Sequence, residues 1–211
     1  MVILPSARPP LALPGFENIK RAWNRTFEAY SARLNPGEYY VTKNEEGIYT
    51  TLGSCISACI RDRVSGIGGM NHFMLPASTG EGGWKDAGLS SSTRYGNFAM
   101  EHLINEILKN GGSRQNLEVK LFGGGRIIAN MTDVGLRNIA FAHEYIRVEG
   151  LKVTSEDVGD VFPRMVVYFP ATGKVRVKRL RSLHTNTIVE QEKAYLGKIE
   201  KEPVSGDIEL F

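Results

Sequence analysis

Alternating apolar and polar positions predict a chain dominated by short β-strands. Strands are expected at residues 39–42, 48–52, 56–61, 67–75, 117–122, 163–169 and 174–180. Most of these segments come as neighbours joined by short turns rich in Gly, Asn, Ser or Pro. That arrangement is typical of hairpins, so mostly antiparallel pairing is expected.

Two further segments have the spacing of amphipathic helices. The first ends at Asn110-Gly111-Gly112, and the second begins after a cap at Thr132 or Asp133 and ends at Gly150. Their apolar faces consist of Met100, Leu103, Ile104, Ile107 and Leu108, and of Leu136, Ile139, Ala140, His143 and Ile146. Because strands outnumber helices, we expect an α/β fold with a largely antiparallel β-sandwich flanked by helices.

The length of 211 residues and the hydrophobic content of 42% fit one globular domain. The structured domain is expected at residues 36–181. Residues 1–35 are expected to form a proline-containing N-terminal extension or a short added helix, and residues 182–211 a polar C-terminal tail.

Charge and cysteine content exclude several classes of protein. The net charge of +3 comes without a dense basic patch, so nucleic-acid binding is not expected; the basic run at residues 174–181 fits a solvated sheet face first and a surface for an acidic partner second. No stretch approaches the roughly 20 apolar residues of a membrane span, and no signal peptide is recognised. Cys55 and Cys59 are too few and too close for a disulfide framework, which favours a reduced, cytoplasmic protein.

The segment from Thr51 to Pro76 carries the candidate chemistry. A hairpin with a two-residue loop at Arg63-Val64 would place Cys55 opposite His72, and a longer loop would shift this pairing by about one step. An imidazole beside a thiol stabilises the thiolate, and it can later protonate a leaving amine. The sequence therefore predicts Cys55 as a nucleophile and His72 as its proton-transfer partner.

Neighbouring residues supply the other parts that such a site needs. Thr50 and Thr51 are both candidates to orient the imidazole. Gly53 and Ser54 let the backbone bend, so that N–H groups point at a developing oxyanion.

Each of these features also has a simpler interpretation. A buried cysteine is usually a small core residue, which is how we interpret Cys59, and the other histidines (His102, His143 and His184) are interpreted as structural or exposed. A metal held by Cys55, Cys59 and His72 would lack a fourth ligand, so no metal or cofactor is expected. The run Gly123-Gly124-Gly125 has no P-loop pattern after it and indicates tight backbone packing.

At these positions the sequence resembles the chemoreceptor glutamine deamidases, the CheD family. The resemblance rests on Gly53-Ser54-Cys55 and on His72-Phe73-Met74-Leu75-Pro76, and it continues through the glycine loop, residues 134–138 and residues 156–164 as far as the hairpin at Thr172-Gly173. It covers about residues 36–181. Asp160 departs from a glycine often found after the Asp157-Val158-Gly159 motif.

The resemblance implies a fold, an activity and partners. The fold is an α/β/β/α sandwich shared with toxin glutamine deamidases. The activity is deamidation of glutamines on the cytoplasmic helices of methyl-accepting chemotaxis receptors by a Cys, His and Thr set, and in some species the phosphatase CheC is a further partner. Cys55 and His72 match directly. The threonine is expected where this chain has Tyr49, and a one-residue gap aligns Thr50, with Thr51 in reserve.

Three functional hypotheses follow from the sequence. The first is a glutamine deamidase working through a Cys55 thioester. The second is another hydrolase on the same cysteine, such as a receptor methylesterase. The third is an adaptor without catalysis that binds receptors or a CheC-type partner.

Overall fold

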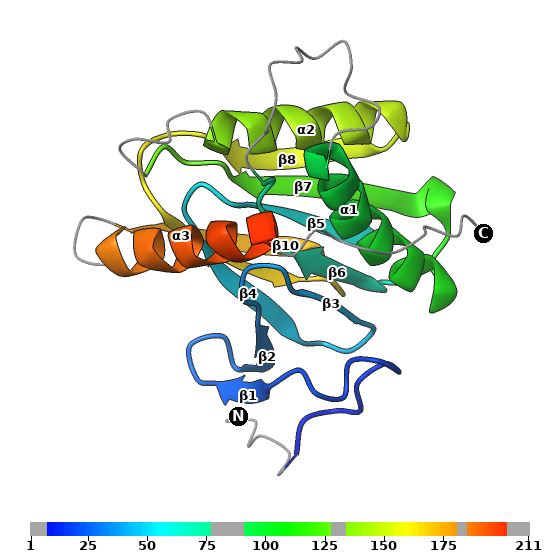
Figure 1. Ribbon diagram of the computed structural model, residues 1–211. Coiled ribbons are helices and arrows are strands. Elements are labelled where there is room, and N and C mark those ends of the chain that lie inside the picture. The colour runs from blue at the N-terminus through cyan, green and yellow to red at the C-terminus, as the bar shows by residue number, and fades with distance from the viewer. Residues whose placement is uncertain (1–7, 77–90, 128–133, 181–184, 202–211) are drawn as a thin grey trace.

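The computed structural model describes residues 8–76, 91–127, 134–180 and 185–201, and these form two five-stranded sheets (Figure 1). The first sheet has the order β1 (Arg21–Asn24), β2 (Ala29–Arg33), β4 (Gly47–Leu52), β9 (Arg164–Phe169), β10 (Lys174–Arg179). The second has the order β3 (Tyr39–Thr42), β6 (Gly68–Asn71), β5 (Ile56–Asp62), β7 (Leu117–Gly123), β8 (Lys152–Val158). Among the strands of these described residues, only the β2–β4 and β7–β8 pairs are parallel, so the predicted, largely antiparallel sandwich is confirmed.

Two of the helices cover the second sheet. Helix α1 (Ser91–Lys109) packs on β3, β5 and β6, and α2 (Val134–Val148) packs on β5, β7 and β8. Helix α1 buries the predicted face. On α2 the predicted face was wrong, because Leu136 and His143 are exposed, and the helix instead buries Val134, Asn138, Phe141, Ala142 and Tyr145. The expected cap at Thr132 or Asp133 lies outside the described residues. A short 3-10 helix, η2 (Arg114–Asn116), precedes β7. The third helix, α3 (Thr185–Lys201), crosses the sandwich as the orange-red ribbon of Figure 1.

Part of the segment expected as an N-terminal extension, residues 21–33, belongs to the first sheet. Strands β1 and β2 form a hairpin, and β2 pairs in parallel with β4. The expectation of a short added helix here was therefore wrong. Arg21 on β1 forms an ion pair at 3.0 Å with the buried Glu46, whose other oxygen accepts hydrogen bonds from Tyr40 and Thr42. This polar cluster ties the first hairpin to both sheets.

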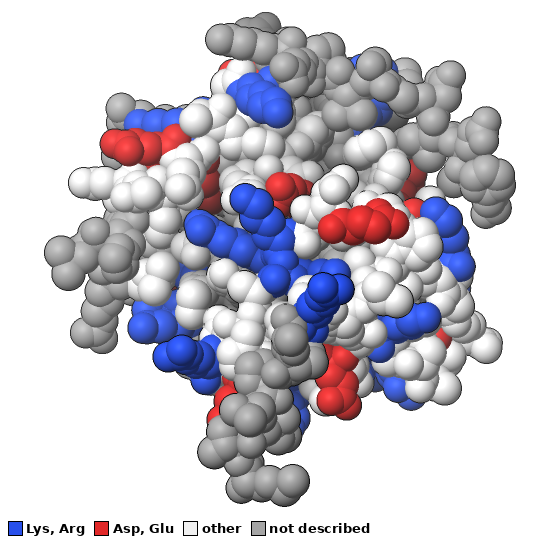
Figure 2. Space-filling view, turned by 90° about the horizontal axis from the view of Figure 1, so that it is seen from below, with Lys and Arg blue, Asp and Glu red and all other residues white. Residues whose placement is uncertain are grey.

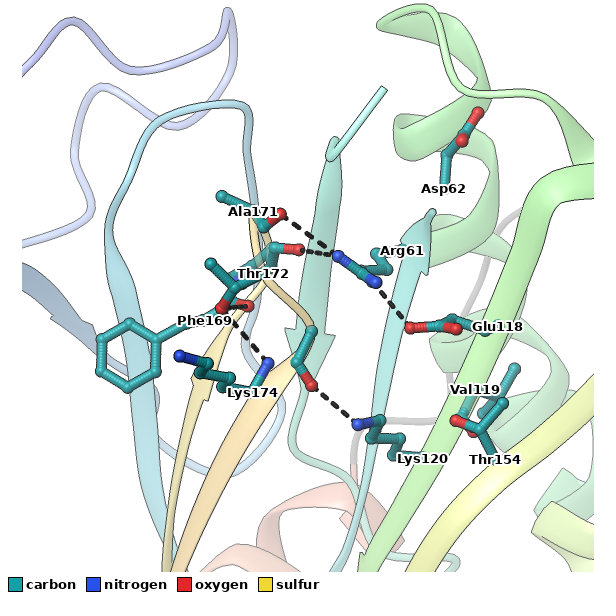
Figure 3. A network of polar contacts seen from close by, with 12 residues as sticks. Arg61, Asp62, Glu118, Val119, Lys120, Thr154, Phe169, Ala171, Thr172 and Lys174 are labelled. Carbon is teal, nitrogen blue, oxygen red and sulfur yellow. Dashed lines mark hydrogen bonds and ion pairs between the residues drawn. The ribbon is translucent and has the colours of Figure 1, made fainter. Parts of the chain in front are cut away.

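Two basic side chains at the same end of the sandwich hold the turn between β9 and β10 (Figure 3). Arg61 on β5 binds Glu118 on β7 at 2.7 Å and donates to the carbonyl of Ala171 in the β9–β10 turn at 3.2 Å. Lys120 on β7 donates to Gly173 of the same turn at 2.7 Å. Strands of one sheet thus hold the hairpin of the other.

Basic side chains also mark the surface. On β10, Lys174, Arg176 and Lys178 are exposed, which confirms the solvated sheet face expected for this run. Figure 2 shows Lys and Arg side chains gathered near the middle of one face of the molecule, with acidic side chains around them. Among the described helices, none combines the length and apolar character that a membrane span needs.

Asn138 on α2 connects two loops that matter below. It is fully buried, its Oδ1 accepts from the Leu75 N–H at 2.9 Å, and its Nδ2 donates to the Ser54 carbonyl at 2.8 Å. One side chain thereby fixes the chain just before Cys55 and just after His72.

Replacement Asn138→Ala should destabilise the protein by about 2–4 kcal/mol, because it leaves one buried N–H and one buried carbonyl without partners. Urea unfolding at neutral pH measures this. The exposed amide Gln115 provides the matched control, and Gln115→Ala should stay within about 0.5 kcal/mol of the parent. Equal stabilities for the two variants would show that Asn138 has no anchoring role.

Candidate active site

Cys55 lies between β4 and β5, on a backbone held in place by the glycine loop. The N–H of Gly124 donates to the Cys55 carbonyl and that of Gly125 to the Gly53 carbonyl, both at 2.7 Å. Gly123 has φ +113°, and a Cβ there would lie 2.2 Å from the Cys55 carbonyl oxygen. The loop therefore serves tight backbone packing, as its sequence indicates.

These contacts also set the direction of the N–H groups. In a trans peptide the carbonyl and the following N–H point in opposite directions. The Gly53 and Ser54 carbonyls are held by Gly125 and Asn138, so the N–H groups of Ser54 and Cys55 point the other way. Together with the Gly53 N–H they form a concave group of donors beside the Cys55 side chain, called here the amide cradle (the N–H groups of Gly53, Ser54 and Cys55).

The hairpin that carries the two candidate residues has a different register from the one expected. Asp62 pairs with Ile67 across a four-residue loop, and the Asp62 carboxylate accepts from the N–H groups of Val64 and Ser65. Gly66 takes φ +76°, which closes this longer loop. The two-residue loop at Arg63-Val64 was therefore wrong. The alternative of a longer loop, with the pairing shifted by one step on each strand, is confirmed, and Ile56 pairs with Phe73.

The corrected register still brings the two candidates to one side. Residues 55 and 72 precede the paired residues 56 and 73, so both side chains point to the face opposite to Ile56 and Phe73. Cys55 Sγ, a ring nitrogen of His72 and a carboxylate oxygen of Glu192 all lie within 4.8 Å of one another. Both Cys55 and His72 are buried, His72 with 2% of its surface exposed.

Thr50 on β4 is the threonine that meets the imidazole. Its Oγ1 lies 2.7 Å from His72 Nδ1 and 2.8 Å from the Leu34 carbonyl. A carbonyl can only accept, so the single hydroxyl proton goes to Leu34 and Thr50 accepts from Nδ1–H. His72 Nε2 then carries a lone pair, and this buried atom has no hydrogen-bond partner among the described residues.

The fourth participant, Glu192, was not predicted. It lies on α3 (Thr185–Lys201), so the expectation of a tail without regular structure at residues 182–211 was wrong for this segment. The Glu192 carboxylate accepts from the three amides of the cradle, at 2.9 Å from Gly53, 2.8 Å from Ser54 and 3.0 Å from Cys55. The Ser54 hydroxyl adds a fourth bond at 2.6 Å. The helical spacing of Ile188, Leu196 and Ile199 could have predicted an amphipathic helix here. No sequence pattern, however, indicates that Glu192 on the same face is buried.

Burial is the main cause of the shifted pKa values of Cys55 and His72. Burial raises the pKa of the Cys55 thiol well above its usual value, and the nearby Glu192 carboxylate raises it further. Burial also lowers the pKa of His72 to about 3, against the hydrogen bond at Leu34 that raises it. A neutral thiol beside a neutral imidazole is therefore the state that this environment favours.

Cys55, His72 and Glu192 could together offer three ligands to a soft divalent metal such as zinc. Their hydrogen bonds favour another role, because both oxygens of Glu192 already accept from N–H and O–H donors. A cradle of N–H groups binds anions and repels cations. A cavity of about 20 Å³ lies beside His72 and Glu192, with room for one water molecule.

Known proteins resemble this chain closely. A family model described as CheD chemotactic sensory transduction matches residues 74–179. The probable chemoreceptor glutamine deamidase CheD of Halorhodospira halophila is 54% identical over 203 residues, which cover 96% of this chain and 94% of that protein. Proteins of the same description from Hahella chejuensis and Saccharophagus degradans are 52% and 49% identical, over 96% and 97% of this chain and 95% of each relative.

A solved Neisseria meningitidis structure of the DUF152 family is a distant likeness, with a TM-score of 0.38 and 10% identity over 62% of this chain and 64% of that one. The relatives match a wider span than the expected residues 36–181, since 96% coverage includes β1, β2 and α3. Identity at this level over nearly the whole sequence shows that the chain belongs to the CheD family.

Proposed function

We propose that this chain is a cytoplasmic protein-glutamine deamidase that converts specific glutamines of methyl-accepting chemotaxis receptors to glutamates, and so regulates chemotaxis. The observation that carries the proposal is the grouping of Cys55, a His72 oriented by Thr50, and the amide cradle. The close relatives described as chemoreceptor glutamine deamidases supply the substrate class. A CheC-type phosphatase as a further partner stays a prediction.

The first half of the reaction uses the neutral pair. His72 Nε2 takes the thiol proton, and the Cys55 thiolate attacks the carboxamide carbon of the substrate. The amide cradle donates to the oxyanion that forms on the carbonyl oxygen. The C–N bond then breaks, the proton on His72 leaves with the nitrogen as ammonia, and a thioester remains on Cys55.

The second half returns the site to its starting state. His72 Nε2 takes a proton from water, the hydroxide attacks the thioester, and the oxyanion again occupies the cradle. Collapse of this intermediate breaks the C–S bond and releases glutamate, while the proton returns to the sulfur. The balance is one carboxamide and one water converted to one carboxylate and one ammonium, with no cofactor.

Mass spectrometry of a receptor cytoplasmic fragment tests the proposal against the alternatives. We expect a gain of about one dalton at each modified glutamine, abolished by Cys55→Ala because the nucleophile is lost. The buried Cys59 is the matched control, and Cys59→Ala should retain the activity. Methanol release without a mass gain at glutamine would indicate the methylesterase, and tight binding unaffected by Cys55→Ala would indicate the adaptor.

The positioning role of Thr50 can be separated from general effects of β4. Thr50→Val should lower kcat by about 100-fold with KM little changed, because the imidazole loses its tautomer and orientation. Thr51 points to the other face of the strand, so Thr51→Val should stay near the parent value. Rescue by Thr50→Ser is expected from the hydroxyl that it restores. Equal kcat values for the two valine variants would contradict the role of Thr50.

The buried neutral imidazole also makes stability depend on pH. The unfolded chain takes up a proton on His72 below about pH 6.5, whereas the folded chain does so only near its pKa of about 3. The unfolded state thus binds more protons in this window, and stability falls as the pH is lowered. Between pH 6.5 and 4.5 we expect His72 to contribute a loss of roughly 2–3 kcal/mol.

Urea unfolding across this pH range measures the effect as a difference between variants. His72→Asn should remove the contribution and flatten the slope relative to the parent. The surface residue His143 serves as the control for replacing a histidine, and His72→Asn should flatten the slope more than His143→Asn does. A parent and a His72→Asn variant with the same slope would contradict a buried neutral imidazole.

A further inference from the structure

The side chain that fills the amide cradle is chemically the product of the proposed reaction. Deamidation of a glutamine leaves a glutamate, and Glu192 places a glutamate carboxylate on the cradle beside Cys55 and His72. The arrangement is that of an enzyme with product bound, except that the product belongs to the same chain. This step rests on the proposed function, because it takes the cradle as the place where the substrate carbonyl sits.

Glu192 in this position opposes catalysis. Its oxygens occupy the N–H groups of Gly53, Ser54 and Cys55 that an oxyanion would need. Its negative charge also disfavours a thiolate on the neighbouring sulfur. A carboxylate that acted as a general base would instead need an oxygen directed at water or at the imidazole, but both oxygens of Glu192 are taken up by donors of the loop.

Helix α3 also closes the site to other molecules. Cys55 is fully buried and His72 nearly so. The cavity that remains beside them, about 20 Å³, is lined in part by Ile188 and Glu192 of α3 and is far too small for a glutamine side chain. A glutamine of another protein can reach Cys55 only when α3 has moved away.

The contacts of α3 resemble those of a docked peptide helix. Ile188, Leu196 and Ile199 are buried on the face that carries Glu192. The Tyr195 hydroxyl forms a hydrogen bond with that of Tyr95 on α1, and its ring packs on the backbone at residue 37, where a Cβ would lie 3.0 Å from it. An amphipathic helix with apolar residues one turn on each side of a central carboxyl or carboxamide group therefore fits this surface.

We propose that α3 is a tethered product analogue: it occupies the groove for a glutamine-bearing receptor helix, holds Glu192 in the amide cradle, and keeps the enzyme inactive until the receptor helix displaces it. The groove identifies the substrate as a helix that presents its glutamine between apolar positions four residues away on each side. The device lies within one chain, so it needs no separate inhibitor.

A glutamine placed on α3 at position 192 should become a substrate in cis. In Glu192→Gln, Cys55 attacks the new carboxamide, ammonia leaves with the His72 proton, and water hydrolyses the thioester. Peptide mass spectrometry should find position 192 converted back to glutamate, with a gain of about one dalton and a rate independent of protein concentration. The double variant Cys55→Ala, Glu192→Gln should keep the carboxamide, as should Glu190→Gln on the exposed face of α3.

A second experiment removes the Glu192 carboxylate and asks whether the enzyme becomes more active. Glu192→Ala should raise the rate of deamidation of a receptor fragment, and the rate of Cys55 alkylation by iodoacetamide, each by about tenfold, because α3 loses its central anchor. Glu190→Ala should change neither rate. Thermal unfolding of both variants establishes that the sandwich is intact.

The outcomes separate this proposal from the proposed function. If the parent modifies the receptor fragment but Glu192→Gln keeps its carboxamide and Glu192→Ala is not activated, α3 is not a product analogue and the deamidase stands. If folded Glu192→Ala loses activity as Cys55→Ala does, Glu192 assists catalysis and the inhibitory role is overturned. If neither the receptor fragment nor position 192 is modified by any variant, the deamidase itself fails.

Discussion

Two consecutive peptide groups before Cys55 are locked by their carbonyls, and the candidate site depends on this constraint. Gly125 and Asn138 hold the carbonyls of Gly53 and Ser54, so the following N–H groups must face the opposite side. The donors come from different parts of the chain, the glycine loop after β7 and helix α2. The amide cradle is thus a product of the whole second sheet and its helix, and not of the Gly-Ser turn alone.

The second constraint is the single proton of the Thr50 hydroxyl. Because the Leu34 carbonyl must receive it, Thr50 can only accept from His72, and the imidazole is left with its lone pair on Nε2. Leu34 follows β2, the strand that pairs in parallel with β4. The N-terminal hairpin therefore contributes to the site by setting the tautomer of a histidine on the other sheet, which makes it part of the working domain.

The local pattern of apolar and polar residues predicts several of the elements and two of the site residues. Periodicity predicts the strands at residues 39–42, 48–52 and 117–122 and the presence of α1 and α2, although not the buried face of α2. Cys55 and His72 come together through an antiparallel pairing that tolerates a change of two residues in loop length, since parity keeps both side chains on one face. Thr50 was distinguished from Thr51 only by the gap chosen in a resemblance. Successive side chains of β4 point to opposite faces, so only one of the two threonines can face His72. Which one it is depends on the side of β4 on which the second sheet packs.

The missed elements share a physical cause. Strands β2 and β8 pair in parallel with β4 and β7, from which they are separated by longer stretches of chain, and β1 joins the sheet through its hairpin with β2. Non-local pairing of this kind leaves little signature in a window of a few residues. Helix α3 is polar for most of its length, and a glutamate in such a segment is normally solvated. Its burial is decided by the amide cradle, which lies about 137 residues away along the chain.

A tethered occupant changes what the site requires of its substrate. An attached helix competes at an effective concentration in the millimolar range for a short linker, whatever the protein concentration. The apparent affinity for a receptor helix is reduced by the fraction of molecules with α3 displaced. A free glutamine or a short unstructured peptide lacks the flanking apolar contacts that Ile188 and Leu196 make, so it gains too little to displace α3. Only a helix that reproduces these contacts can compensate for their loss, and selectivity for a folded helical substrate then follows from the closed state itself.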